Sequence, residues 1–225
     1  ASALTGRPNI DIFAVAKHYY AAGSGSATEG MNYCLQAAQA AVQQPAVSET
    51  REYIKMAREC ANVAGFDEDN PEFITLECHL AHISGEGRAE IAQKCIDRLE
   101  VDPEPTPEFL LITVRSCYDA AMDQRDQNLF AQAVKIGEQL ISHPKAKLID
   151  QADGFHFIGL SLSPKEIELR EQNLTRAFDL LDNIDSDDTA AQALLARVSN
   201  SLALQLERDN PVESNRLYQK SIDIK

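Results

Sequence analysis

The sequence predicts an all-α protein, an α-solenoid of stacked antiparallel helical hairpins with about eleven helices. The first observation is composition: Trp is absent and aromatic residues make up only 6% of the chain, which favours helices over strands. The second is a series of capping residues followed by proline, which mark helix starts. The third is spacing, since the predicted helices pair into hairpins of roughly 35 to 42 residues, a period typical of stacked helical repeats.

Charge and hydropathy exclude several classes of partner. The 225 residues are 44% hydrophobic and 25% charged, and the formal net charge is −14. A strongly acidic chain repels nucleic-acid phosphates and anionic lipids, so we expect neither nucleic acid nor membrane as a partner. No stretch of the sequence is long and apolar enough to predict a membrane span. The charge would suit a protein or peptide partner with a basic surface, although in most acidic proteins such a charge serves solubility only.

The five cysteines predict an intracellular protein. They are odd in number and widely spaced, and each falls in a different predicted helix: Cys34, Cys60, Cys78, Cys95 and Cys117. This pattern is not that of a disulfide framework. Thiols of this kind usually act as small buried hydrophobic side chains, which suits close helix contacts. We therefore expect a reducing compartment, the cytoplasm or the nucleus.

The first three helices are predicted from periodicity and breaks. A helix over 8–22 with one apolar face is expected to cap the stack, and the Gly/Ser run at 23–26 to end it as a flexible connector. That run does not have the lysine and the preceding strand of a phosphate-binding loop. The next helices are expected at 28–43 and at 48–64, the latter with Ser48 as N-cap.

Proline marks the starts of four later helices. A capping residue precedes Pro71, Pro107, Pro164 and Pro211. Proline is favourable there because its missing N–H would have no partner in the first turn, while the capping side chain accepts a hydrogen bond from a nearby N–H. The remaining helices are predicted at 70–84, 88–100, 106–124, 127–142, 147–160, 164–183, 188–207 and 211–224.

We expect one helical-repeat domain over 1–225. It would comprise a capping helix and connector at 1–25, irregular hairpins at 26–145 and more regular hairpins at 146–225. The sequence begins without Met and its last helix runs to the final residue, so we expect a fragment of a longer chain.

Residues with catalytic or metal-binding chemistry do not form a recognisable motif. Cys78 and His82 are four residues apart on one helix face, as two metal ligands can be, but a third and fourth ligand are not evident nearby. The acidic stretch 182–188 does not have the glycine and the terminal glutamate of a calcium loop. We therefore predict no metal, no cofactor and no enzymatic activity.

The last hairpins resemble tetratricopeptide repeats. Ser214 and Ser221 fall where that family has small residues, and Tyr218 falls at its aromatic position. Residues 155–162 are similar to the first helix of a second repeat, and 177–181 to its second helix. The turn before Pro211 and the pair Ser201-Leu202 depart from the family pattern. The resemblance implies a right-handed stack whose concave side binds a peptide or a partner protein.

Carried over by position, the resemblance implies a set of groove residues on the first helix of each repeat. These are His156, Leu160, Ser199, Asn200, Ala203 and Glu207. Asn200 would hydrogen-bond the backbone of a bound peptide. At the C-terminal edge, Leu217 and Ile222 are expected to be exposed, with Tyr218 inside its own hairpin. The alternative function is a structural scaffold or a helical appendage of a larger enzyme or complex.

Overall fold

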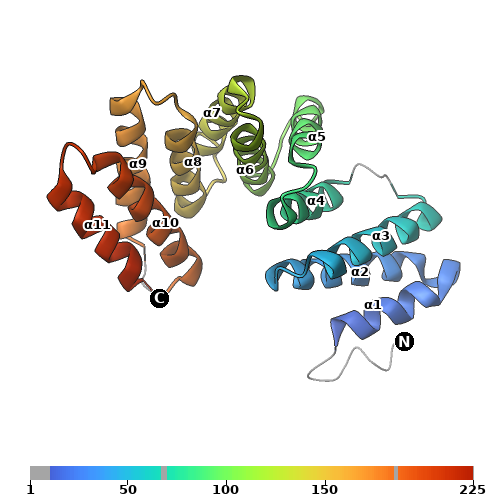
Figure 1. The fold of residues 1–225 in the computed structure, drawn as a ribbon. Coiled ribbons are helices and arrows are strands. Elements are labelled where there is room, and N and C mark those ends of the chain that lie inside the picture. The colour runs from blue at the N-terminus through green and yellow to red at the C-terminus, as the bar shows by residue number, and fades with distance from the viewer. Residues whose placement is uncertain (1–10, 67–69, 185–186, 225) are drawn as a thin grey trace. The chain divides into compact units, whose positions relative to one another are not determined.

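The all-α prediction is confirmed by the computed structural model, which describes residues 11–66, 70–184 and 187–224. No strand occurs in these ranges, which hold eleven α-helices and one short 3-10 helix (Figure 1). The elements are α1 (Ile12–Ala21), η1 (Gly23–Ser26), α2 (Ala27–Gln43), α3 (Val47–Ala64), α4 (Pro71–Ser84), α5 (Arg88–Val101), α6 (Pro107–Gln124), α7 (Gln127–Ile141), α8 (Leu148–Ser161), α9 (Ile167–Asp182), α10 (Thr189–Leu206) and α11 (Pro211–Asp223).

The chain divides into two compact units. Unit 1 comprises residues 1–95 and unit 2 comprises residues 96–225, so the boundary falls inside α5. The handedness of the stack and the extent of its most regular part, 146–225, stay predictions.

Three of the four proline starts are confirmed. Helices α4, α6 and α11 begin at Pro71, Pro107 and Pro211. Before each proline, an Asn or Thr side chain accepts a hydrogen bond from a first-turn N–H, at 2.9 to 3.2 Å. Because these N–H groups have no partner within the helix, the capping side chain satisfies them. Local sequence therefore determines these three starts.

The fourth start was wrong by three residues. Ser163 and Glu166 form the contact expected of a capping box, since the Ser163 N–H donates to the Glu166 carboxylate at 2.9 Å. The Glu166 N–H also donates to the Ser163 carbonyl, at 2.9 Å, which closes a turn rather than a helix. Glu166 itself has a non-helical backbone (φ −92°, ψ 48°), and α9 begins only at Ile167.

Two expectations near the N-terminus are also corrected. The Gly/Ser run, which we expected to be a flexible connector, forms a short 3-10 helix, η1. Helix α3 begins at Val47 after Ala46, so Ser48 lies within its first turn and is not the N-cap. In α1 the carboxylate of Asp11 caps the first turn, and residues 8–10, which we expected to begin this helix, lie outside the described residues.

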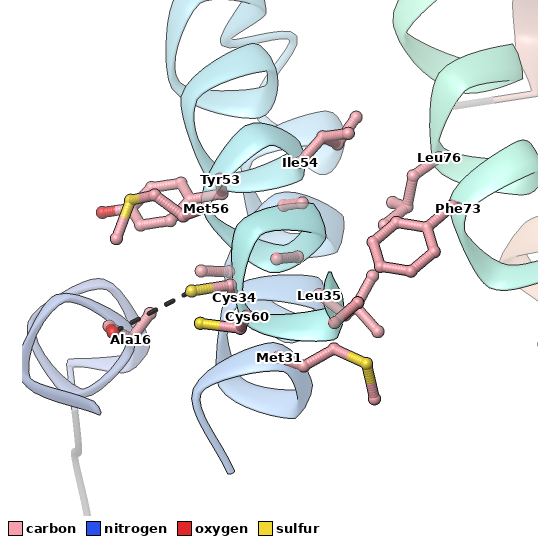
Figure 2. Close-up of a cluster of buried hydrophobic side chains, with 14 residues drawn as sticks. Ala16, Met31, Cys34, Leu35, Tyr53, Ile54, Met56, Cys60, Phe73 and Leu76 are labelled. Atoms are coloured by element: carbon pink, nitrogen blue, oxygen red, sulfur yellow. Dashed lines mark hydrogen bonds between the residues drawn. The ribbon is translucent and has the colours of Figure 1, made fainter. Parts of the chain in front are cut away.

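Unit 1 is built around α2 and α3, with α1 and α4 packed against them. Its core contains small side chains at the helix contacts and larger ones between them (Figure 2). The small residues include Ala37, Ala38 and Ala57, none of which is exposed. Close packing of this kind makes the unit sensitive to added volume, because the interior has little free space.

Unit 2 contains three hairpins, α6–α7, α8–α9 and α10–α11, stacked in chain order. Within it the first helices of successive hairpins also pack against each other, α6 on α8 and α8 on α10. We call the side formed by α6, α8 and α10 the inner face. Of the second helices, α7 packs against α6 and α8, and α9 packs against α8 and α10. Helix α8 is the central element, and most of its residues are buried.

Candidate functional site

The inner face of unit 2 has a buried acidic residue near its middle. Asp153 lies in α8 between Ala152 and Gly154, and its side chain is only 7% exposed. An ionised carboxylate is costly to bury unless cations or hydrogen-bond donors surround it. The residues around Asp153 therefore determine whether this charge can be accommodated.

Two arginines from the flanking helices surround the carboxylate. Oδ2 of Asp153 lies 3.6 Å from Nη2 of Arg115 in α6 and 3.9 Å from Nη2 of Arg197 in α10. The arginine side chains are 22% and 49% exposed, respectively. One buried carboxylate thus contacts side chains from two other hairpins. Charge therefore links the first helices of all three hairpins, α6, α8 and α10, in addition to apolar packing.

The charges at this point do not cancel. Two guanidinium groups face a single carboxylate, which leaves an excess of one positive charge in a chain whose net charge is −14. Burial lowers the pKa of Arg197 and the second cation, Arg115, lowers it further, while Asp153 raises it. A guanidinium nevertheless stays protonated in proteins. The half-exposed Arg197 is therefore a positive group that a ligand could reach.

A histidine and a serine extend the polar group. Nε2 of His156 lies 3.0 Å from Oγ of Ser201, and the Ser201 hydroxyl donates to the Arg197 carbonyl at 3.1 Å. Since that hydroxyl hydrogen is already used, His156 donates from Nε2. Its Nδ1 faces Oδ1 of Asp153 at 3.8 Å, and neither atom has a hydrogen-bond partner within the protein. We call Arg115, Asp153, His156, Arg197 and Ser201 the Asp153 centre.

Exposed apolar side chains lie on the same sides of α6 and α10 as the two arginines. Met122 follows Arg115 by two helical turns in α6, and Leu204 follows Arg197 by two turns in α10, so each lies on the same side of its helix as the arginine. The two side chains are 55% and 63% exposed. Asn200, one turn from Leu204, is exposed as well. The face thus offers charged, amide and apolar groups together.

The groove residues implied by the family resemblance occupy different environments. Asn200 and Glu207 are exposed and Leu160 is half-buried, whereas His156, Ser199 and Ala203 are buried, at 4%, 0% and 0%. For these three the expected exposure was wrong.

The physical reason is the rotation of the helices. Ser199 and Ala203 are four residues apart on the side of α10 that carries Val198 and Leu202, the apolar side. Ser214 of α11 donates to the Ala203 carbonyl at 2.8 Å, so this side faces the second helix of the same hairpin. An ungapped alignment to a repeat pattern does not fix that rotation, because one residue turns the helix by about 100°.

Of the two residues expected to be exposed at the C-terminal edge, one is exposed and the other is buried. Ile222 is 67% exposed, as predicted, but Leu217 is only 1% exposed and belongs to the unit 2 core. Tyr218 is half-buried against the same core. Helix α11 also contacts α9, because Lys220 pairs with Asp182 and lies 4.9 Å from the ring centroid of Phe178. These contacts cover the side of α11 that carries Leu217, while Ile222 stays exposed.

Sequence reasoning missed Arg115, Asp153 and Arg197. One signal was available, since Asp153 is the only acidic residue in the run 152–160, which is apolar apart from Asp153 and His156. A charge in such a run predicts a buried partner of opposite sign. The sequence could not identify that partner, because both arginines come from other hairpins.

Metal and membrane features are not found in the described part of the chain. Within residues 11–66, 70–184 and 187–224, no three His, Cys, Asp or Glu side chains are grouped so that they could hold a metal ion. In the same ranges, no helix combines the length and the apolar character that crossing a bilayer requires. Comparison with protein-family models, with curated proteins and with solved structures found no match to this chain.

Proposed function

We propose that this chain is a non-catalytic protein-interaction module that binds a peptide or a partner protein on the inner face of unit 2. The observation that supports this most directly is the Asp153 centre, where three hairpins present a half-exposed cation, Arg197, above a buried carboxylate. Side chains held by several helices are pre-organised, which lowers the entropy cost of binding.

The groups beside Arg197 suit recognition of a peptide. The Asn200 amide has both donors and an acceptor, so it can pair with the backbone of an extended segment. Leu204 and Met122 can bury apolar side chains of the partner. The excess positive charge near Arg197 favours an acidic side chain of the partner at this point, while the net charge of −14 favours basic groups elsewhere on it. We expect neither nucleic acid nor membrane as a partner, and an intracellular location.

Capture of partners by the intact chain, followed by substitution, tests the proposal. A photo-crosslinking residue at position 204 should trap the partner, and the same residue at position 169 should not. Leu169 is a matched control because it is an exposed leucine, at 46%, that lies in the second helix α9. Crosslinking of equal yield at both positions would contradict the assignment to the inner face.

Substitutions separate binding from folding. Asn200→Ala should weaken binding of the crosslinked partner several-fold, because it removes an amide that can pair with the partner's backbone. Leu204→Asp should weaken binding about tenfold or more, because it places a charge on an exposed apolar contact. Leu169→Asp should leave binding unchanged. The melting temperature of Asn200→Ala should equal that of the wild type. If neither inner-face variant affects any captured partner, the scaffold alternative is the better account of this chain.

A further inference from the structure

Two buried thiols of unit 1 lie close together on adjacent helices. Sγ of Cys78 in α4 is 3.2 Å from Sγ of Cys95 in α5. The two side chains are 3% and 0% exposed. Glu77 precedes Cys78 and Lys94 precedes Cys95, and these two residues form an ion pair. Nζ of Lys94 lies 3.1 Å from Oε2 of Glu77. The ion pair therefore holds the two helices in the register that places these sulfurs together.

We propose that Cys78 and Cys95 are a redox-active pair that forms a reversible disulfide when the protein is exposed to hydrogen peroxide. The sulfurs must approach each other by about 1.2 Å to reach disulfide length. One thiolate attacks the peroxide, and its sulfur becomes a sulfenic acid as hydroxide leaves. The second thiol then displaces the sulfenic oxygen. The two thiols lose two electrons and two hydrogens, and one peroxide becomes two water molecules.

Helix α5 provides a route for the oxidant. Only Ile91, Ala92 and Cys95 are buried among the residues of α5, whereas α2 buries eight of its residues. A helix that buries few side chains opens locally at small cost, and such opening exposes its buried groups to solvent. When α5 closes again, the Glu77–Lys94 ion pair returns Cys95 to Cys78.

Unit 1 contains a second pair of cysteines that serves as an internal comparison. Cys34 and Cys60 lie close together in the core between α2 and α3 (Figure 2). Burial, with Cys60 as the second cause, raises the pKa of the Cys34 thiol to about 12. Only the thiolate reacts readily with peroxide. Helix α2 buries eight residues and α5 only three, so α2 should open far less often than α5. Cys34 and Cys60 should therefore stay reduced under conditions that oxidise Cys78 and Cys95.

The position of the pair predicts what oxidation changes. Cys95 is the last residue of unit 1, and α5 continues into unit 2. A bond to Cys78 ties α5 covalently to α4 and suppresses local opening of α5. The oxidised chain should therefore unfold at a higher temperature, and its α5 amides should exchange more slowly with deuterium. Dithiothreitol should reverse both effects.

Peptide mapping of the full chain tests the proposal. The folded protein is treated with hydrogen peroxide, the peroxide is removed, and the remaining thiols are blocked with iodoacetamide in urea before digestion and mass spectrometry. Cys60 and Cys78 share the tryptic peptide 59–88, so a second cut by a glutamate-specific protease, at Glu72 or Glu77, is required. We expect a crosslinked Cys78–Cys95 peptide at least about tenfold more abundant than any other pair, because chain separation alone discriminates pairs only weakly.

Controls make the result decisive in either direction. Cys95→Ala should abolish the crosslink and Cys117→Ala should retain it. In urea the same treatment should give mixed pairs. The proposal is overturned if Cys78 and Cys95 are both recovered alkylated from the wild-type chain that was folded during the peroxide treatment, under conditions in which peroxide has fully oxidised a dithiol standard. It is also overturned if the crosslink forms only in urea, or if Cys95 pairs equally with Cys60. This test is independent of the binding proposed for unit 2.

Discussion

The carboxylate of Asp153 in α8 lies 3.6 Å from the guanidinium of Arg115 in α6, across the contact between two successive hairpins of unit 2. Helical repeats usually stack through apolar side chains, so each unit covers the next. Here a buried charge pair is part of the same contact. It couples the stability of the stack to the chemistry of the inner face.

Asp153→Asn should destabilise unit 2 while preserving side-chain volume. The change leaves the guanidiniums of Arg115 and Arg197 without their carboxylate. Removing one partner of a fully buried ion pair costs several kcal/mol, but Arg197 is half-exposed, so we expect about 1–3 kcal/mol. Urea unfolding followed by circular dichroism measures the loss. Glu168→Gln on the exposed side of α9 is the control and should change stability by less than about 0.5 kcal/mol. Equal effects of the two changes would contradict the role of Asp153.

Leu217→Ala and Ile222→Ala should differ strongly although both residues lie in α11. Leu217 is 1% exposed and Ile222 is 67% exposed. Truncating the buried leucine removes apolar contacts and leaves a cavity, which costs about 2–5 kcal/mol. Truncating the exposed isoleucine should lower the free energy of unfolding by less than about 0.5 kcal/mol. Thermal unfolding of the two variants provides the comparison, and similar melting temperatures would show that α11 does not pack as described.

Gly137→Ala should destabilise the contact between α7 and α8. A Cβ at Gly137 would lie 2.7 Å from Cγ1 of Ile158, too close without a shift of that side chain. Alanine normally favours a helix over glycine by about 1 kcal/mol, yet overpacking of this kind costs about 1–3 kcal/mol. We expect a net loss, measured by urea unfolding.

Gly25→Ala is the matched control for the glycine experiment. No atom lies within 4 Å of a Cβ built at Gly25. Its effect should therefore stay within about 0.5 kcal/mol. A stabilised Gly137→Ala variant would mean that Ile158 moves aside without cost.

The Cys34 thiol should resist alkylation in the folded protein. Burial raises its pKa from an ordinary 9.0 to about 12, so at pH 8.5 very little thiolate is present. Iodoacetamide should modify Cys34 rapidly in urea and hardly at all without it, as peptide mass spectrometry can show. Rapid modification of the folded chain would contradict the burial of this thiol.

The same pKa shift predicts a dependence of stability on pH. In the unfolded chain the Cys34 thiol ionises near pH 9, whereas in the folded chain it stays protonated to about pH 12. Its contribution to stability is therefore complete below pH 9 and lost as the pH rises from 9 to 12. Cys34→Ala should lose less stability over this window than the wild type, as measured by urea unfolding at each pH.

Local sequence signals predicted the helices well. Proline and its capping residue determine the starts of α4, α6 and α11, because the cap, the fixed φ and the missing N–H all act within one turn. The Ser163 start failed for a reason that is also local: the same side-chain contact that caps a helix can close a turn. The predicted exposure of the groove positions was less accurate, since Ser199 and Ala203 are buried on the side of α10 that faces α11.

The sequence by itself determined the all-α class, the number of helices and most of their ends, because these depend on propensity, capping and breaks within a few residues. Only the tertiary structure decided which side of each helix is covered. It brought Arg115 and Arg197 to Asp153, buried Leu217 and left Ile222 exposed, and placed Cys78 beside Cys95. These outcomes depend on the rotation of each helix against neighbours far away in the chain, and a residue pattern with a period of 3.6 allows several rotations of similar energy.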